Sequence, residues 1–257
     1  MRVIILAAGL GSRLGELTKE VPKCMIKYQD KCLIDYQCEA IAKAGIKQIA
    51  VVGGYKINTL KEHLTILQNR LKLDIKVFEN TRFNSTNMVY SLFCAREFIT
   101  RCKNENQNLL ISYSDIVYTS DFIQKLKETN GDFNIMVDKN WLELWQKRFS
   151  DPLSDAETLK IKNDKIVELG KKPSNLNDIQ GQYIGLFSFK ADFINIICKA
   201  WDNLDKDTLY DGKNYENMYM TSFLQHLIDN FKSANAVFAP DAWLEIDNPG
   251  DLNIKIN

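Results

Sequence analysis

Residues 2–23 read RVIILAAGLGSRLGELTKEVPK, an apolar run that passes directly into a glycine-rich, basic segment. Val3 to Leu6 are continuously apolar, which is typical of a strand buried on both faces of a sheet. Gly9 and Gly11 then allow the backbone to come close to a ligand. Because amide groups in such a turn point outward, the segment from Ala7 onward is predicted to bind an anion.

Two common phosphate-binding loops do not match the glycine spacing of this segment. The dinucleotide fingerprint needs a third glycine placed to pack the helix, and the P-loop needs Gly-Lys followed by Ser or Thr. Gly9, Gly11 and Gly15 satisfy neither pattern. A polyphosphate cradle of another kind is therefore predicted, with two cations, Arg13 and Lys23, at its rim.

The pattern Leu-Ala-Ala-Gly-x-Gly-x-Arg-Leu, followed by Thr18 and then by Pro22 and Lys23, resembles the signature of the nucleotide-diphospho-sugar pyrophosphorylases, the nucleotidylyltransferase family. This resemblance implies that Arg13 contacts the leaving phosphates of a nucleoside triphosphate and that Lys23 contacts the α-phosphate, so both are catalytic candidates. A guanidinium grips phosphate oxygens in bidentate fashion, whereas a lysine acts as a point charge. The resemblance also implies nucleotide contacts at Leu6, Ala7, Ala8, Gly9, Gly11 and Ser12.

Length, charge and cysteine spacing favour a small-molecule enzyme. The 257 residues include 33 acidic and 33 basic side chains, so no basic excess indicates nucleic-acid binding. No apolar stretch of about 18 residues predicts a membrane span, and no signal peptide is recognised, so a cytoplasmic protein is expected. The six cysteines lack Cys-x-x-Cys spacing, which predicts reduced thiols and no zinc site. The sequence leaves a homo-oligomer open.

Apolar periodicity predicts alternating strands and helices. Strands are expected at 46–53, 75–78, 109–112, 183–190 and 236–246, and helices at 32–44, 58–73 and 86–100. This alternation predicts an α/β fold with an open, mostly parallel, Rossmann-like sheet and helices on both faces, in a single domain of residues 1–257. The pattern loosens from Trp141 to Lys172, so we expect a small inserted acceptor-binding lobe over about residues 141–180. Ligands of such sheets bind beyond the carboxyl ends of the strands.

Two aspartates follow predicted strands at this edge of the sheet. Asp115 ends the stretch LLISYSD, and Asp247 lies in WLEIDNPG, where it could instead begin a turn. Mg²⁺ commonly takes one or two carboxylates together with substrate phosphates and water. Because the family resemblance implies metal-binding aspartates at both positions, a Mg²⁺ site at Asp115 and Asp247 is predicted.

Two polar turns extend the predicted nucleotide site. Gly53-Gly54-Tyr55 follows the second strand, and FNSTNMVYSL, residues 83–92, leads into a helix. The resemblance places the base and ribose at these turns, and amide groups there can distinguish cytosine from uracil or thymine. The second block looks most like the cytidylyltransferase branch that includes the phosphocholine and phosphoglutamine enzymes. The predicted contacts are Gly53, Tyr55, Asn84, Thr86, Asn87 and Ser114.

The predicted acceptor contacts come from the second half of the chain. The segment ELGKKP resembles the family's Glu-Lys-Pro, whose lysine binds the acceptor phosphate; this assigns Lys172 and leaves Lys171 as the alternative. Tyr183 and Trp141 could form aromatic walls for a quaternary ammonium, whereas Arg148 could meet a carboxylate. An exposed turn for the lysines and plain packing for the aromatic residues are the alternatives.

Together these features predict a Mg²⁺-dependent cytidylyltransferase that transfers CMP from CTP to the phosphate of a small non-sugar acceptor, such as phosphocholine or phosphoglutamine, and releases pyrophosphate. A sugar-1-phosphate nucleotidylyltransferase that uses UTP, dTTP or CTP is one alternative. A non-catalytic nucleotide-sensing module is another, although binding alone would not require both carboxylates. The expected setting is surface polysaccharide biosynthesis, with neither nucleic acid nor a membrane as partner.

Overall fold

Strand β1 (Arg2–Ala7) is buried along its whole length, as its apolar sequence predicts. In the computed structural model, which describes residues 1–231 and 234–256, β1 lies inside the main sheet. It pairs in parallel with β4 (Gln48–Gly53) on one side and with β6 (Leu109–Tyr113) on the other. The three strands therefore end at the same edge of the sheet.

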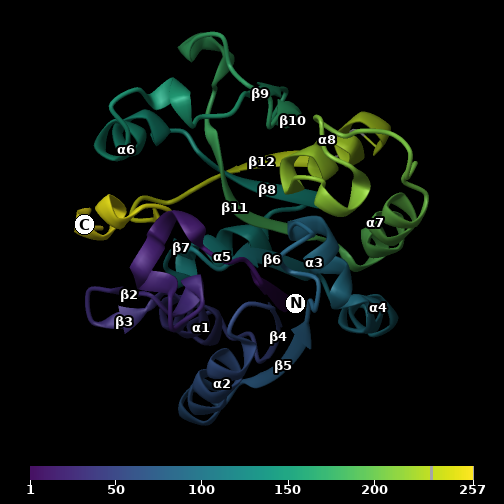
Figure 1. The fold of residues 1–257 in the computed structure, drawn as a ribbon. Coiled ribbons are helices and arrows are strands. Elements are labelled where there is room, and N and C mark those ends of the chain that lie inside the picture. The colour runs from purple at the N-terminus through teal and green to yellow at the C-terminus, as the bar shows by residue number, and fades with distance from the viewer. Residues whose placement is uncertain (232–233, 257) are drawn as a thin grey trace.

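The main sheet has nine strands and is mostly parallel (Figure 1). Among these nine, β11 and β10 run against the other seven. The strands lie in the order β5 (Asp74–Glu79), β4, β1, β6, β11 (Gln182–Phe189), β8 (Phe133–Asp138), β12 (Ala234–Phe238), β10 (Lys165–Leu169) and β9 (Leu159–Lys162). This arrangement confirms the predicted α/β fold class.

Helices cover both faces of the sheet, as predicted. Side chains of α1, α2, α5 and α6 pack in one core with Val3 and Ile5, and those of α3, α4, α7 and α8 pack in another with Ile4 and Leu6. The division follows because successive strand residues point to opposite faces. The bounds are α1 Leu33–Lys43, α2 Ile57–Leu71, α3 Met88–Cys94, α4 Arg96–Asn104, α5 Ser120–Glu128, α6 Trp141–Arg148, α7 Ala191–Asp202 and α8 Met220–Phe231.

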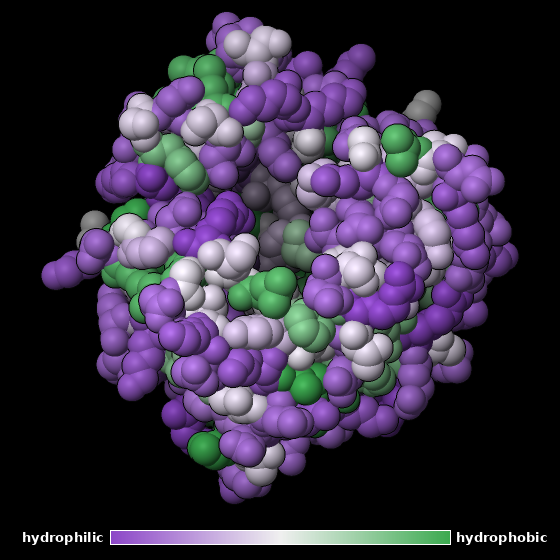
Figure 2. All heavy atoms as spheres, viewed as in Figure 1, coloured by the Kyte–Doolittle hydropathy of each residue, from purple (hydrophilic) through white to green (hydrophobic). Residues whose placement is uncertain are grey.

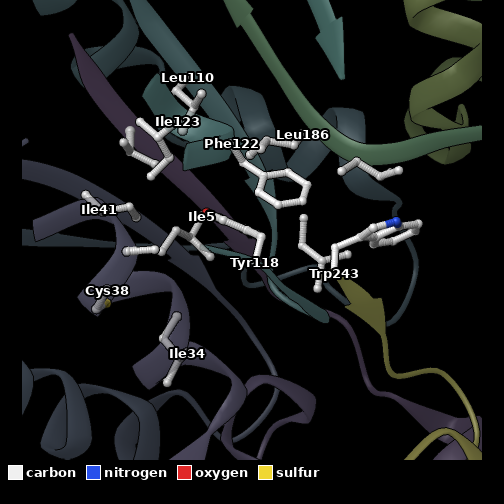
Figure 3. Close-up of a cluster of buried hydrophobic side chains, with 14 of the residues drawn as sticks. Ile5, Ile34, Cys38, Ile41, Leu110, Tyr118, Phe122, Ile123, Leu186 and Trp243 are labelled. Carbon is white, nitrogen blue, oxygen red and sulfur yellow. The ribbon is translucent and has the colours of Figure 1, made fainter. Parts of the chain in front are cut away.

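The first of these cores fixes the strands that lead to the site. Figure 3 shows Ile5 and Leu110 of the sheet beside Ile34 of α1 and Phe122 of α5, and all four are fully buried. Truncating such a side chain to Ala typically costs about 2–5 kcal/mol. The segments that follow β1 and β6 therefore begin at strand ends that are held by a well-packed core.

Short elements complete the described chain. Two small sheets pair β2 (Lys27–Tyr28) with β3 (Lys31–Cys32) and β7 (Ile116–Val117) with β13 (Leu244–Glu245). The 3₁₀ turns are Ser12–Thr18, Lys23–Met25, Pro152–Ser154, Leu176–Asp178, Tyr215–Asn217 and Pro249–Asn253. Among the described residues, no helix is long and apolar enough to span a membrane.

The helix predicted at 86–100 is two helices in the structure. Asn87 caps α3, because its side chain accepts a hydrogen bond from the N–H of Met88 at 2.8 Å. Ala95, with φ −91° and ψ 25°, then leaves the helical conformation, and α4 begins at Arg96. The two halves pack on different partners, α3 on α8 and α4 on α7, which explains the change of direction.

Two other predictions differ from the structure. The strand expected at 236–246 divides into β12 and β13, and Pro240, which lacks an N–H, lies between them. The segment expected to form a lobe contributes β9 and β10 to the edge of the main sheet, where Lys165 of β10 pairs with Asn235 of β12. Helix α6 and the turns around residues 149–158 and 170–180 lie outside the strands.

Candidate active site

The loop after β1 closes on the side chain of Lys23. Gly11 has a φ of +63°, and a Cβ added there would come within 3.0 Å of side-chain atoms of Lys23 and Thr18. The hydroxyl of Thr18 donates to the carbonyls of Gly11 and Gly15, at 3.3 and 3.1 Å. A glycine is thus needed at Gly11 both for its conformation and for the close approach of Lys23.

Lys23 joins the loop to two carboxylates from distant parts of the chain. Its Nζ donates to Oδ2 of Asp115 at 2.6 Å and also to Oδ1 of Asp247. Asp115 follows β6 and Asp247 follows β13, and only 14% of the Lys23 side chain is exposed. Burial disfavours the charge on Lys23, but Asp115 and Asp247 outweigh it and raise its pKa.

Three carboxylates at this point form a donor set that suits a hard cation. Asp115, Glu245 and Asp247 each offer an oxygen, and these atoms lie within 4.8 Å of one another. Oδ1 of Asp115 is buried and has no hydrogen-bond partner among the described residues. Burial and the charge of Asp247 raise the pKa of Glu245 to about 7. Crowded carboxylates with an unsatisfied buried oxygen fit a divalent cation such as Mg²⁺.

A first cavity, the loop cavity, lies beside Lys23 and the end of β1. It collects eight of the residues that sequence reasoning placed at the nucleotide or the metal: Leu6, Ala8, Gly9, Lys23, Thr86, Asn87, Ser114 and Asp115. Phe83, Met88 and Ser91 also line it. The last three belong to the FNSTNMVYSL block, so its apolar positions contribute as well as its amides.

The other predicted nucleotide residues do not line the loop cavity. Ala7, Gly11, Ser12, Arg13, Gly53, Tyr55 and Asn84 are absent from its wall, and Asn84 is exposed. Tyr55 instead anchors the loop, because its N–H donates to the carbonyl of Ala8 at 3.2 Å. Gly54 of the same turn allows close contact with Phe83: a Cβ there would lie 2.6 Å from the Phe83 Cβ.

A second cavity, the aromatic cavity, adjoins the first through Met88, which lines both. Its wall includes Tyr113, Trp145, Tyr183 and Tyr219, and the carboxylate-bearing residues Asp155, Glu157, Glu245 and Asp247. Arg13 also lines it, and its Nη2 lies 3.0 Å from Oδ2 of Asp247. The face seen in Figure 2 is hollowed near its centre, over the part of the sheet that Figure 1 labels β8, β11 and β12.

A bulge in β11 shapes the wall of the aromatic cavity. The pairing of β11 with β8 shifts between Tyr183 and Phe187, and Gly185 within this stretch has a φ of +79°. A Cβ at Gly185 would lie 2.6 Å from the ring of Tyr113. The bulge thus lets the rings of Tyr113 and Tyr183 meet edge to face, with centroids 5.6 Å apart.

Of the four predicted acceptor residues, Tyr183 alone lines the aromatic cavity. Trp141 is buried against Trp145 in the core, and it is Trp145 that reaches the cavity wall. Lys172 is exposed and donates to the carbonyls of Leu153 and Ser154, at 2.6 and 3.1 Å. These placements count against acceptor contacts at Trp141 and Lys172, and the alternative Lys171 pairs with Glu168 at 3.0 Å.

The fourth predicted acceptor residue, Arg148, is the centre of a buried ion-pair network. Its side chain is 0% exposed, and it pairs with Glu245 at 2.7 Å and with Asp251 at 3.2 Å. Asp251 also accepts hydrogen bonds from the N–H groups of Asp247 and Asn248, each at 2.8 Å. These carboxylates neutralise Arg148, which counts against its contact with an acceptor carboxylate; Arg148 instead holds the turn that carries Asp247.

The whole chain matches proteins that share this organisation. A family model described as Nucleotidyl transferase matches residues 2–253. The chain belongs to the nucleotidyl transferase family. This confirms the resemblance carried by the pattern of residues 6–23.

Individual relatives point to one branch of this nucleotidyl transferase family. The chain is 51% identical over all of its 257 residues to CTP:phosphoglutamine cytidylyltransferase of Campylobacter jejuni, and it covers 99% of that protein. It is 27% identical over 205 residues to 2-aminoethylphosphonate cytidylyltransferase of Lancefieldella rimae, covering 80% of this chain and 73% of the relative.

Solved structures of low sequence identity share the fold. The inositol-1-phosphate CTP transferase of T. maritima superposes with a TM-score of 0.74 at 21% identity, over 98% of this chain and 91% of that one. This match supports the α/β assignment.

Proposed function

We propose that this protein is a CTP-dependent cytidylyltransferase that transfers CMP to the phosphate of phosphoglutamine or of a similar small, non-sugar acceptor. The observation that carries the proposal is the contact of Lys23 with both Asp115 and Asp247, where the loop cavity adjoins the aromatic cavity. A charged lysine and a set of carboxylates at this junction suit the transfer of a phosphoryl-type group between two ligands. The full-length similarity to a phosphoglutamine enzyme supports the choice of acceptor.

The reaction needs positioning and charge more than proton transfer. An oxygen of the acceptor phosphate attacks the α-phosphorus of CTP, the bond from that phosphorus to the bridging oxygen breaks, and pyrophosphate leaves with the electron pair. Lys23 would contact the α-phosphate, and the exposed Arg13 would contact the departing phosphates. Because the acceptor phosphate is already an anion, no side chain has to act as a base.

The carboxylate set provides for a divalent cation. Asp115, Glu245 and Asp247 would hold Mg²⁺, whose chemistry here is to neutralise negative charge on the nucleotide phosphates. Arg148 and Asp251 hold the turn that presents Asp247, so the donor oxygens keep their spacing. The cytoplasmic location, the link to surface polysaccharides and a homo-oligomer stay predictions.

A pyrophosphate-release assay tests the proposal. The four nucleoside triphosphates are each combined with Mg²⁺ and with phosphoglutamine, phosphocholine, 2-aminoethylphosphonate or glucose 1-phosphate. The expected result is fastest release with CTP and phosphoglutamine. Preference for UTP or dTTP with glucose 1-phosphate would support a sugar nucleotidylyltransferase instead. Binding of CTP without turnover of any acceptor would support the sensing module.

A further inference from the structure

Glu157 is a carboxylate in the wall of the aromatic cavity that the proposed reaction does not use. Gln182 of β11 holds its backbone on both sides: the N–H of Glu157 donates to Oε1 at 3.2 Å, and its carbonyl accepts from Nε2 at 2.6 Å. Within residues 1–231 and 234–256, no hydrogen bond or ion pair involves the Glu157 carboxylate. Gln182 thus holds the backbone of Glu157 in place, while the Glu157 carboxylate has no partner among the described residues.

The surroundings of Glu157 give it no compensating cation. Asp155 lines the same cavity, and burial together with the charges of Asp155 and Asp211 raises the pKa of Glu157 to about 7. Arg13 is the basic residue of this wall, and it pairs with Asp247. Glu157 is partly buried, and a second carboxylate rather than a cation lies near it in the wall, so a ligand that supplies the opposite charge accounts for its presence.

Aromatic side chains around Glu157 add a second feature that suits a cation. Tyr113 and Tyr183 meet edge to face, and Trp145 and Tyr219 line the same cavity. The hydroxyl of Tyr183 is buried and makes no hydrogen bond to any described residue. Aromatic faces attract ammonium groups, and an unsatisfied hydroxyl offers a lone pair to an N–H donor.

We infer that Glu157 is the counter-ion for an ammonium group on the acceptor, with the buried Tyr183 hydroxyl as its neighbour in the same cavity. The inference rests on the proposed function, and it narrows the acceptor to a class: a phosphate, phosphoramidate or phosphonate at one end and a positively charged nitrogen at the other. The phosphate end approaches the α-phosphate of CTP beside Lys23, and the nitrogen end meets Glu157. The phosphates of polyols and of uncharged sugars carry no ammonium group and therefore cannot pair with Glu157.

The test compares a charged acceptor with its uncharged analogue in matched variants. Calorimetry measures the Kd of phosphoglutamine and of its desamino analogue, N-phosphorylated glutaramate, in the presence of a non-hydrolysable CTP analogue. The proteins are the wild type, Glu157→Gln, Glu157→Asp and Glu143→Gln, an exposed carboxylate on α6 outside this cavity. Turnover of CTP with both acceptors is followed in parallel.

The wild type should bind phosphoglutamine at least about tenfold more tightly than the desamino analogue, as expected for a charge-assisted hydrogen bond. Glu157→Gln should lose most of this preference with CTP affinity unchanged, whereas Glu157→Asp and Glu143→Gln should keep it. A wild type that binds both compounds equally would overturn the inference even if Glu157→Gln failed to fold. A folded Glu157→Gln that keeps the full preference would overturn it too.

The binding and turnover arms separate this inference from the proposed function. A wild type that binds phosphoglutamine selectively through Glu157, yet releases no pyrophosphate from CTP, would refute the transfer reaction and retain the ammonium site. Turnover that is equally fast with the desamino analogue would retain the reaction and refute the site.

Discussion

The loop cavity and the aromatic cavity differ in how their residues are distributed along the chain. Most of the loop cavity comes from two short blocks, residues 6–23 and 83–91, and it adds Ser114 and Asp115. The aromatic cavity combines the runs 182–185 and 219–221 with residues from several other segments between Arg13 and Asp247. Phosphates can be held by one contiguous loop, whereas an acceptor pocket can be assembled from whichever distant side chains the fold brings together.

This difference explains why many of the residues predicted for the nucleotide meet in one cavity, whereas most of those predicted for the acceptor do not meet in the other. A local pattern reports on backbone conformation and neighbouring charges, which is enough to predict a glycine-rich turn at Gly11 with Lys23 beside it. The partners of Arg148 lie about a hundred residues away, so nothing near Arg148 in the sequence indicates that Glu245 and Asp251 neutralise it.

The largest expected effect is on stability, from Arg148→Met. Removing the guanidinium leaves the buried Asp251 and the partly buried Glu245 without their cationic partner. Loss of one member of a buried ion pair typically costs about 3–5 kcal/mol. Denaturant unfolding of the variant, beside Lys147→Met on the exposed side of α6, measures this cost. A loss equal to that of the control would mean that Arg148 is not a structural anchor.

The next effect is on catalysis, from Lys23→Ala. Removing a charge that stabilises the transition state should lower kcat by at least about two orders of magnitude. Lys19→Ala, which removes an exposed lysine from the same loop, is the control and should stay near the wild-type rate. Steady-state assays of pyrophosphate release compare the variants. A near-normal kcat for Lys23→Ala would show that Lys23 does not stabilise the transition state.

A smaller effect concerns the pH dependence of stability. The pKa of Glu157 is about 7 in the folded protein and is ordinarily near 4.5. A raised folded-state pKa means that the unfolded chain releases its proton first, so stability is fully present below about pH 4.5 and falls as the pH rises through about 7. The loss should reach roughly 2 kcal/mol, since Glu157 is partly accessible.

Urea unfolding at about pH 5 and about pH 8, for the wild type and Glu157→Gln, checks this prediction. The variant cannot titrate at this position, so it should lose less stability than the wild type over the same interval. Equal pH dependence in both proteins would show that Glu157 is ionised at an ordinary pKa and is not desolvated.

The smallest effect is expected from Lys172→Ala. Its Nζ contacts the carbonyls of Leu153 and Ser154 and lies outside the aromatic cavity, so the KM of the acceptor should change less than about twofold. A tenfold rise in that KM, with the KM of CTP unchanged, would restore the role that the ELGKKP segment suggested. It would also show that a local motif can predict a residue of the acceptor site.

Much of the fold follows from sequence, and the exceptions share one cause. The apolar runs of β1, β4 and β6 predict their strands, because burial on both faces leaves a local signature. The break at Ala95 has no glycine or proline to announce it and reflects the different partners of α3 and α4. Glu245 and Glu157 were missed for a similar reason: their importance depends on neighbours that only the tertiary structure supplies.

Product stoichiometry tests the central claim most directly. Wild-type protein, CTP, Mg²⁺ and phosphoglutamine are followed by phosphorus NMR, which resolves the diphosphate-linked product from CMP and pyrophosphate. The account predicts one pyrophosphate for each CMP joined to the acceptor phosphate, with no turnover when the acceptor is left out. Free CMP in place of the linked product, or pyrophosphate formed equally fast without acceptor, would contradict it.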